Sequence, residues 1–206
     1  MTNRPTFRID GYIGNWPNTA QALAEFLAAH PRRDVDVITN SPGGDAFEGA
    51  AILAEAEAHG RVRFRVRGVA ASSASLLLCG GASVLMHPAA FWMAHRPWSA
   101  LAGDAEVHRA EAELLEKVGR SDAEVYSRFS GHPVPRVQAW LAAETWLSAE
   151  EAVALGFADG LDGEAPPEAP AAADYTKYAA APAALQRLAR ENGWAAVPSE
   201  PKGGEQ

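Results

Sequence analysis

The chain has 206 residues, of which 48% are hydrophobic and 21% charged, the usual balance for a soluble globular domain with one sizeable core. Its formal net charge of −8 argues against nucleic acid as the main partner, because phosphate binding needs clustered Lys and Arg. The single cysteine, Cys79, excludes an intrachain disulfide, and no apolar run approaches the ~20 residues that span a bilayer. We therefore expect a cytoplasmic protein without a membrane segment.

Strands and helices are predicted to alternate along the chain. The predicted strands are residues 7–13, 35–39, 61–67, 83–86 and 91–94. The predicted helices are residues 18–30, 45–59, 72–79, 104–129 and 148–155, with caps at Asn18, Asp45 and Ser148 and stops at Gly60 and Gly156. This alternation predicts an α/β layered fold.

The strand at 61–67 places four arginines on one face, with Val62, Phe64 and Val66 on the other. The arginine face is either a solvated surface or a subunit contact that pairs with carboxylates of a neighbouring copy.

The composition changes to Pro, Ala and Glu after about Gly163. Such a segment buries too little apolar area to offset chain entropy, so we expect one domain at 1–162 and a flexible tail at 163–206. Within the tail, Leu185, Leu188 and Trp194 can form one short helix that docks on a partner; disorder is the alternative.

A candidate nucleophile follows the strand at 61–67. Ser72 is expected at the first turn of its helix, where free backbone N–H groups and the helix dipole favour developing negative charge. An N-cap role explains a serine at this place equally well. Ser73 and Ser75 compete for the role, and nothing in the local sequence excludes them.

Gly43 and Gly44 follow another strand. They are either a tight turn or part of an oxyanion site in which the backbone N–H of Gly44 acts with that of Ser73. His95 is expected at the end of a strand, where it is a structural histidine or a general base, and His87 is a nearby rival.

Four motifs in this order resemble the Clp protease proteolytic subunit family. They are Ser41-Pro42-Gly43-Gly44, Gly68-Val69-Ala70-Ala71-Ser72, Met93-Ala94-His95-Arg96-Pro97 and the run from Trp146 to Asp159. The resemblance covers about Ile9 to Asp159. It implies Ser72 as nucleophile, His95 as base and Glu144 in the place of the family's usual aspartate, with the amides of Gly44 and Ser73 as the oxyanion site.

The same resemblance implies a fold of stacked ββα units of the crotonase type. The long helix near 104–129 would be the handle of a ring-shaped homo-oligomer, and the substrates would be proteins or peptides. No cofactor or metal is implied. If Glu144 is not the triad carboxylate, Asp159 is the first alternative.

The sequence also departs from the housekeeping enzymes of the family. It begins close to its first strand, so we expect the loops that engage an unfoldase ATPase to be absent and the peptidase to act without ATP. Residues 10–14 and 43–49 and the Ala/Pro-rich tail are more similar to the phage branch, whose members are head maturation (prohead) proteases. That similarity implies capsid or scaffold proteins as substrates, in the host cytoplasm or the phage prohead.

Three other functions fit parts of the sequence. A crotonase-type acyl-CoA enzyme would share the fold without needing the serine and histidine. A Ser-Lys peptidase is disfavoured because residues 73–143 contain a single lysine, Lys117, on the amphipathic helix. A non-catalytic capsid or scaffold component is the competitor from another class.

Overall fold

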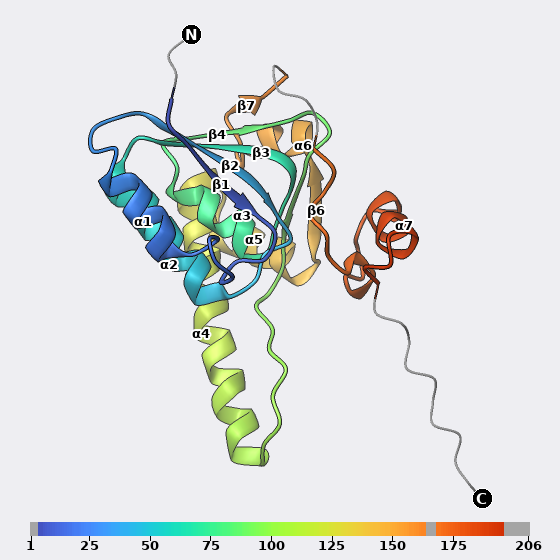
Figure 1. Cartoon of the computed structure of the whole chain (residues 1–206). Coiled ribbons are helices and arrows are strands. Elements are labelled where there is room, and N and C mark those ends of the chain that lie inside the picture. The colour runs from blue at the N-terminus through green and yellow to red at the C-terminus, as the bar shows by residue number, and fades with distance from the viewer. Residues whose placement is uncertain (1–3, 164–167, 196–206) are drawn as a thin grey trace, which may run out of the picture.

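A mostly parallel sheet forms the centre of the molecule (Figure 1). The computed structural model describes residues 4–163 and 168–195 of the chain. Its seven strands are β1 (Thr6–Asp10), β2 (Val35–Ser41), β3 (Val62–Ala71), β4 (Ser83–Met86), β5 (Phe91–Ala94), β6 (Thr145–Ser148) and β7 (Gly160–Leu161). The main order is β1-β2-β3-β4-β7, and β5 pairs with β3 and β6.

Along one edge, strand β3 pairs first with β4 and then with β5. Residues 63–66 pair with β4, and residues 69–71 pair with β5, both in parallel. The antiparallel strand β6 then pairs with β5. The sheet therefore divides in the second half of β3, and Ser72 follows directly where β3 ends.

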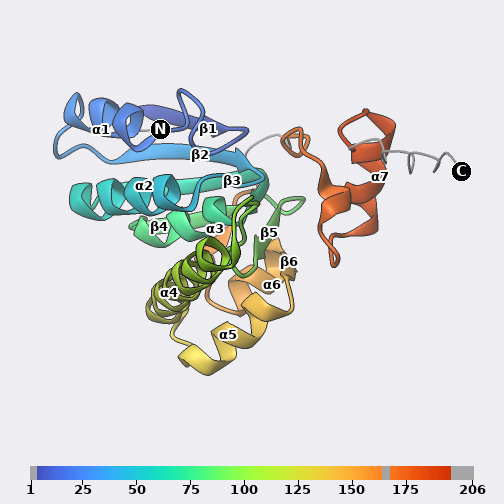
Figure 2. The ribbon, with the colours of Figure 1, turned by 90° about the horizontal axis from the view of Figure 1, so that it is seen from below.

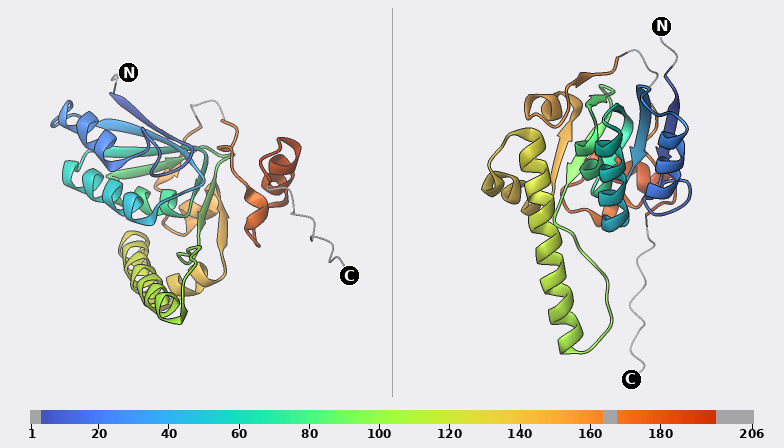
Figure 3. Two further views of the ribbon diagram at one scale, coloured as in Figure 1. Left: turned by 60° about the horizontal axis from the view of Figure 1, so that its bottom comes forward. Right: turned by 90° about the vertical axis from the view of Figure 1, so that its left-hand side faces the viewer.

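Seven α-helices surround this sheet in the described part of the chain. They are α1 (Ala20–Ala28), α2 (Ala46–His59), α3 (Ser73–Leu77), α4 (Ala105–Ser130), α5 (Val134–Ala142), α6 (Ala149–Ala154) and α7 (Ala183–Glu191), with 3-10 turns η1 (Leu78–Gly80) and η2 (Tyr175–Lys177). Figure 2 shows α1, α2 and α3 in a row along the sheet, with α7 beyond β5 and β6. Helix α4 extends past the body of the molecule, beside the chain that joins it to β5 (Figure 3).

The fold class predicted from the sequence is confirmed as mixed α/β with a central sheet and a long helix. The predicted strands correspond to β1–β5. The predicted helices correspond to α1, α2, α3 with η1, α4 and α6. The capping box at Ser148 is present, but Asn18 is not a cap, because Thr19 caps α1 while Asn18 bonds the backbone of Asp10 and Tyr12. The pattern did not predict α5, β6 and β7.

Arginines on one face of β3 form ion pairs with carboxylates of the same chain. Arg63 makes two hydrogen bonds to Asp36, at 2.9 and 2.7 Å, and Arg65 makes two to Asp162, both at 2.6 Å. The Arg65 guanidinium lowers the pKa of Asp162. These partners come from β2 and from the residue after β7, so Arg63 and Arg65 link neighbouring parts of the sheet.

Residues 168–195, hereafter the C-terminal segment, contribute to a second apolar cluster. It joins β3 and β5 to the segment through Val69, Ala71, Met93, Ala171, Tyr175, Tyr178, Ala181, Leu185 and Ala189. The helix predicted around Leu185 is α7, and it packs on this chain. The boundary at residue 162 and the flexibility of the tail stay predictions, and residues 164–167 and 196–206 lie outside the described residues.

Candidate active site

Ser72 occupies a strained turn between β3 and α3. Its φ of 58° and ψ of −129° lie in a region that non-glycine residues rarely adopt. It stands at the N-cap position of α3, yet its side chain makes no capping hydrogen bond. The hydroxyl Oγ lies 2.9 Å from Nε2 of His95 instead. The N-cap alternative therefore does not account for this serine.

The two rival serines are held in the interior. The hydroxyl of Ser75 lies 2.6 Å from the Met93 carbonyl oxygen and 2.7 Å from the Tyr126 hydroxyl, and the residue is fully buried. The hydroxyl of Ser73 is buried without a hydrogen-bond partner among the described residues. Ser72, by contrast, lines a pocket.

His95 follows the last residue of β5, as predicted, and is mostly buried beside Ser72. Burial lowers the pKa of His95; the nearby Glu144 carboxylate raises this pKa and the Lys177 ammonium lowers it. A lowered pKa keeps the imidazole neutral at pH 7, which is the form that accepts a proton. His87 lies in the turn between β4 and β5, where Nδ1 accepts a hydrogen bond from the Ala89 amide, so its role is structural.

The loop that follows β2 lies directly against Ser72. Gly43 has a φ of +96°, and a Cβ atom there would lie 2.6 Å from the Ala71 carbonyl oxygen and 2.7 Å from the Ser72 Cβ. Only glycine combines this backbone angle with so close an approach. Within the described residues, the amides of Gly44 and Ser73 have no hydrogen-bond acceptor. Two free N–H groups close to Ser72 are what an oxyanion site requires.

Glu144 lies between α5 and β6, with a positive φ of 51°. Its carboxylate accepts hydrogen bonds from the amides of Ala180 at 2.7 Å and Ala179 at 3.2 Å, and from the indole of Trp146 at 3.3 Å. Among the described residues no hydrogen bond joins it to His95. Its influence on His95 is electrostatic, and its role in a triad stays a prediction.

Asp159, the alternative carboxylate, is engaged elsewhere. Its side chain accepts a hydrogen bond of 2.6 Å from the Val84 amide, and its own amide donates to the Val84 carbonyl. Asp159 therefore anchors the chain beside β4. It lines neither of the pockets that contain His95.

A pocket of about 410 Å³ opens beside the Ser72 hydroxyl. Its wall includes Gly44 and His95, and also Lys177 and Tyr178 of the C-terminal segment. The Tyr178 ring meets the His95 ring edge-on, with centroids 5.7 Å apart. Sequence reasoning missed these two residues, although the run Tyr175-Thr176-Lys177-Tyr178 places large side chains within the Ala/Pro-rich tail.

Comparison with known proteins gives the same assignment as the motifs. A family model described as Clp protease matches residues 16–163. The chain belongs to the Clp protease family. Proteins of this family are serine peptidases that form ring-shaped homo-oligomers and act on protein substrates, so the chain is a Clp protease-like peptidase.

Individual relatives are about one-third identical to the chain over the aligned residues. The chain is 34% identical to the ATP-dependent Clp protease proteolytic subunit 3 of Rhodococcus jostii over 142 residues. This alignment covers 66% of the chain and 69% of that protein. Identity is 31% over 160 residues to the ATP-dependent Clp protease proteolytic subunit of Porphyromonas gingivalis, covering 75% and 70%. For the ATP-dependent Clp protease proteolytic subunit 6, chloroplastic, of Arabidopsis thaliana it is 32% over 146 residues, covering 68% of this chain and 52% of that protein.

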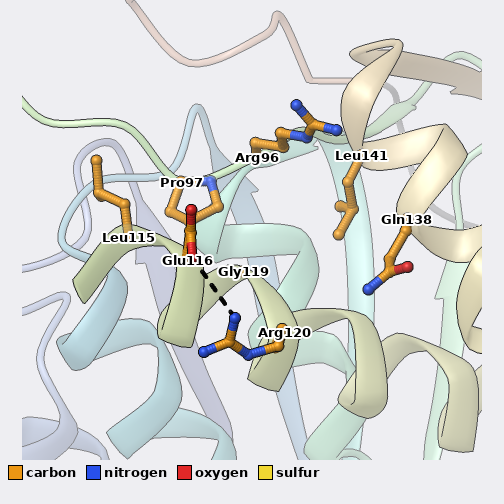
Figure 4. Close-up of a pocket in the computed structure, with 8 residues that line it drawn as sticks. All are labelled: Arg96, Pro97, Leu115, Glu116, Gly119, Arg120, Gln138 and Leu141. Carbon is orange, nitrogen blue, oxygen red and sulfur yellow. Dashed lines mark ion pairs between the residues drawn. The ribbon is translucent and has the colours of Figure 1, made fainter. Parts of the chain in front are cut away.

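A second pocket, of about 450 Å³, lies between α4, α5 and the chain after His95 (Figure 4). Arg96 and Pro97 form one side, and an ion pair of 3.7 Å joins Glu116 to Arg120 on α4. It contains neither Ser72 nor His95. Within the described ranges, no group of three or more His, Cys, Asp or Glu is arranged to hold a metal ion, and no helix is long and apolar enough to cross a membrane.

Proposed function

We propose that this family member is a serine endopeptidase in which Ser72 is the nucleophile and His95 the general base. The observation that carries the proposal is the 2.9 Å contact between Ser72 Oγ and His95 Nε2. Ser72 has a strained backbone conformation, and both residues line the same pocket. A nucleophile within hydrogen-bond reach of a neutral imidazole is the geometry that acyl transfer needs.

The reaction proceeds in two steps. His95 takes the Ser72 proton as Oγ attacks the peptide carbonyl, and the amides of Gly44 and Ser73 bind the developing oxyanion. His95 then gives the proton to the leaving amine. Water then attacks the acyl carbonyl while His95 takes one of its protons, and His95 passes this proton to Ser72 Oγ as the bond between Oγ and the acyl carbon breaks. The acid product leaves and the starting state is restored.

Glu144 is the carboxylate that supports the imidazolium formed in each step. Its charge already raises the pKa of His95 in this structure. Because its hydrogen bonds go to Trp146 and to two amides of the C-terminal segment, it acts through space on His95. A glutamate can serve here because a carboxylate of either length carries the same charge.

The substrates and setting are a finer proposal. The motif similarity of residues 10–14 and 43–49 to the phage branch supports processing of capsid or scaffold proteins during prohead maturation, without ATP, by a ring-shaped homo-oligomer. Helix α4, which projects from the body, supports assembly into a ring (Figure 3).

Activity and substrate can be tested together. The wild-type protein and Ser72→Ala are each co-expressed with the proteins encoded beside the gene, and new protein termini are identified by mass spectrometry. The proposal predicts termini that form with the wild type alone. Termini that persist with Ser72→Ala would refute the nucleophile, and assembly without any cleavage would favour a non-catalytic scaffold component.

A further inference from the structure

The C-terminal segment forms one wall of the proposed active site. We propose that Tyr178 is a positioning residue that holds the His95 imidazole toward Ser72, and that Glu144 secures Tyr178 by binding the two amides that follow it. This inference rests on the proposed function and adds a part of the chain, beyond the matched residues 16–163, to the catalytic apparatus.

Tyr178 packs between the proposed base and the proposed oxyanion loop. Its ring meets the His95 ring edge-on, with an interplanar angle of 76° and centroids 5.7 Å apart. Its hydroxyl lies 3.5 Å from the Pro42 carbonyl oxygen, the outer limit of a hydrogen bond. The residue is 6% exposed, so the ring is almost fully enclosed by its neighbours. Edge-on aromatic packing fixes ring orientation as well as burying area.

Glu144 binds the backbone that directly follows Tyr178. The amides of Ala179 and Ala180, which follow Tyr178 directly, both donate to the Glu144 carboxylate. Trp146 donates to the same carboxylate and packs edge-on against Tyr178 with centroids 5.8 Å apart. Hydrogen bonds to a charged acceptor are stronger than those between neutral groups. The carboxylate therefore holds the backbone that carries Tyr178.

The rest of the segment is docked on the strands that carry Ser72 and His95. The buried side chain of Asn40 donates to the Ala169 carbonyl at 3.0 Å and accepts from the Ala171 amide at 3.0 Å and the Val69 amide at 3.2 Å. Tyr175 is fully buried, and its hydroxyl donates to the Ala171 carbonyl at 2.7 Å. A segment with these buried contacts has a defined position relative to the end of β3.

The segment forms a wall and does not plug the site. Lys177 and Tyr178 line the pocket of about 410 Å³ together with Ser72, and that volume remains open beside the hydroxyl. The contact with His95 is through the ring of Tyr178, whereas the His95 Nε2 contact with Ser72 is intact. This arrangement favours a positioning role over an inhibitory one.

The test compares Tyr178→Ala and Tyr178→Phe in the full chain, with Arg187→Ala on the exposed face of α7 as the matched control. Loss of the ring frees the imidazole, so Tyr178→Ala should lower kcat by about 10- to 100-fold with a smaller change in KM, since a misplacement near 1 Å costs about that much. Phenylalanine keeps the packing and should restore kcat to within about 3-fold. The control should match the wild type.

A pH profile separates positioning from general loss of structure. Burial is the main cause of the lowered His95 pKa, so exposing the imidazole should move the acid limb of kcat/KM to higher pH in Tyr178→Ala and leave it in place in Tyr178→Phe. The charges that act on His95 are those of Glu144 and Lys177, and the pocket is also lined by Asp45 and Glu111. All four are the same in each variant.

The same titration can be followed without turnover, by NMR of the His95 ring in a Ser72→Ala background. A His95 pKa and a kcat that are equal in wild type and Tyr178→Ala would overturn the positioning role. A rise in kcat for Tyr178→Ala would identify the segment as inhibitory and overturn it too. A wild-type protein that cleaves nothing would refute the proposed function, while the NMR titration would still report whether the ring controls His95.

Discussion

Replacing Gly43 with alanine tests whether the loop after β2 sets the position of the nucleophile. Alanine at a φ of +96° stores about 1–3 kcal/mol of backbone strain. Its Cβ would lie 2.7 Å from the Ser72 Cβ, whereas carbon atoms in contact settle at about 3.5 Å, so one of the two must move by roughly 0.8 Å. A displacement near 1 Å costs about 100-fold in rate, and we expect kcat/KM of Gly43→Ala to fall by about that factor.

The assay is kcat/KM on a fluorogenic peptide, measured well below the melting temperature of each variant. The strain alone should lower that temperature by roughly 2–12 °C. Gly60→Ala is the matched control, because Gly60 also has a positive φ, of +70°, but its Cβ would meet nothing closer than the Glu57 carbonyl at 3.8 Å. It should lose stability and keep activity. Wild-type kcat/KM in Gly43→Ala, or an equal loss in Gly60→Ala, would refute the reasoning.

Two further predictions concern the serines and the pH dependence. Ser75→Ala should lower the free energy of unfolding by about 1–3 kcal/mol, because a buried hydrogen-bonded hydroxyl is lost. Ser73→Ala removes a hydroxyl that has no hydrogen-bond partner among the described residues, so its free energy of unfolding should be nearly unchanged. Urea unfolding measures both variants, and equal losses would contradict the assignment. The base must be neutral to act, so kcat/KM should fall as pH drops through the lowered pKa of His95. Glu144→Gln removes a charge that raises this pKa and should move the acid limb to lower pH, while Lys177→Met should move it to higher pH. Shifts in the same direction for both variants would rule out this electrostatic account.

The sequence predicted the central fold well because its strands alternate clearly. The run around Phe64 shows a period of two, and the motifs at Gly43 and Ser72 fall where predicted strands end. Ser72 and His95 both follow predicted strands, but it was the resemblance to the Clp protease family that predicted that they act together. Strand β7 is two residues long, which is too short for periodicity to register. Strand β6 is as long as the predicted strands β4 and β5, and the sequence pattern still did not reveal it.

The C-terminal segment could not be predicted in the same way. Its alanine-rich composition gives no local signal of burial, and its docking depends on Asn40, which lies 129 residues before Ala169. The hydrogen bonds of Glu144 to Ala179 and Ala180 likewise join distant parts of the chain. Contacts of this kind arise from the assembled fold, so the sequence identified Glu144 as a candidate without revealing what it binds.

The most direct test of the account is covalent labelling with a fluorophosphonate, followed by peptide mass mapping. The account predicts a single adduct on Ser72 in the wild-type protein, no adduct in Ser72→Ala, and much slower labelling in His95→Ala, because the 2.9 Å contact with Nε2 activates the hydroxyl. An adduct on another serine, or labelling that is as fast without His95, would contradict it.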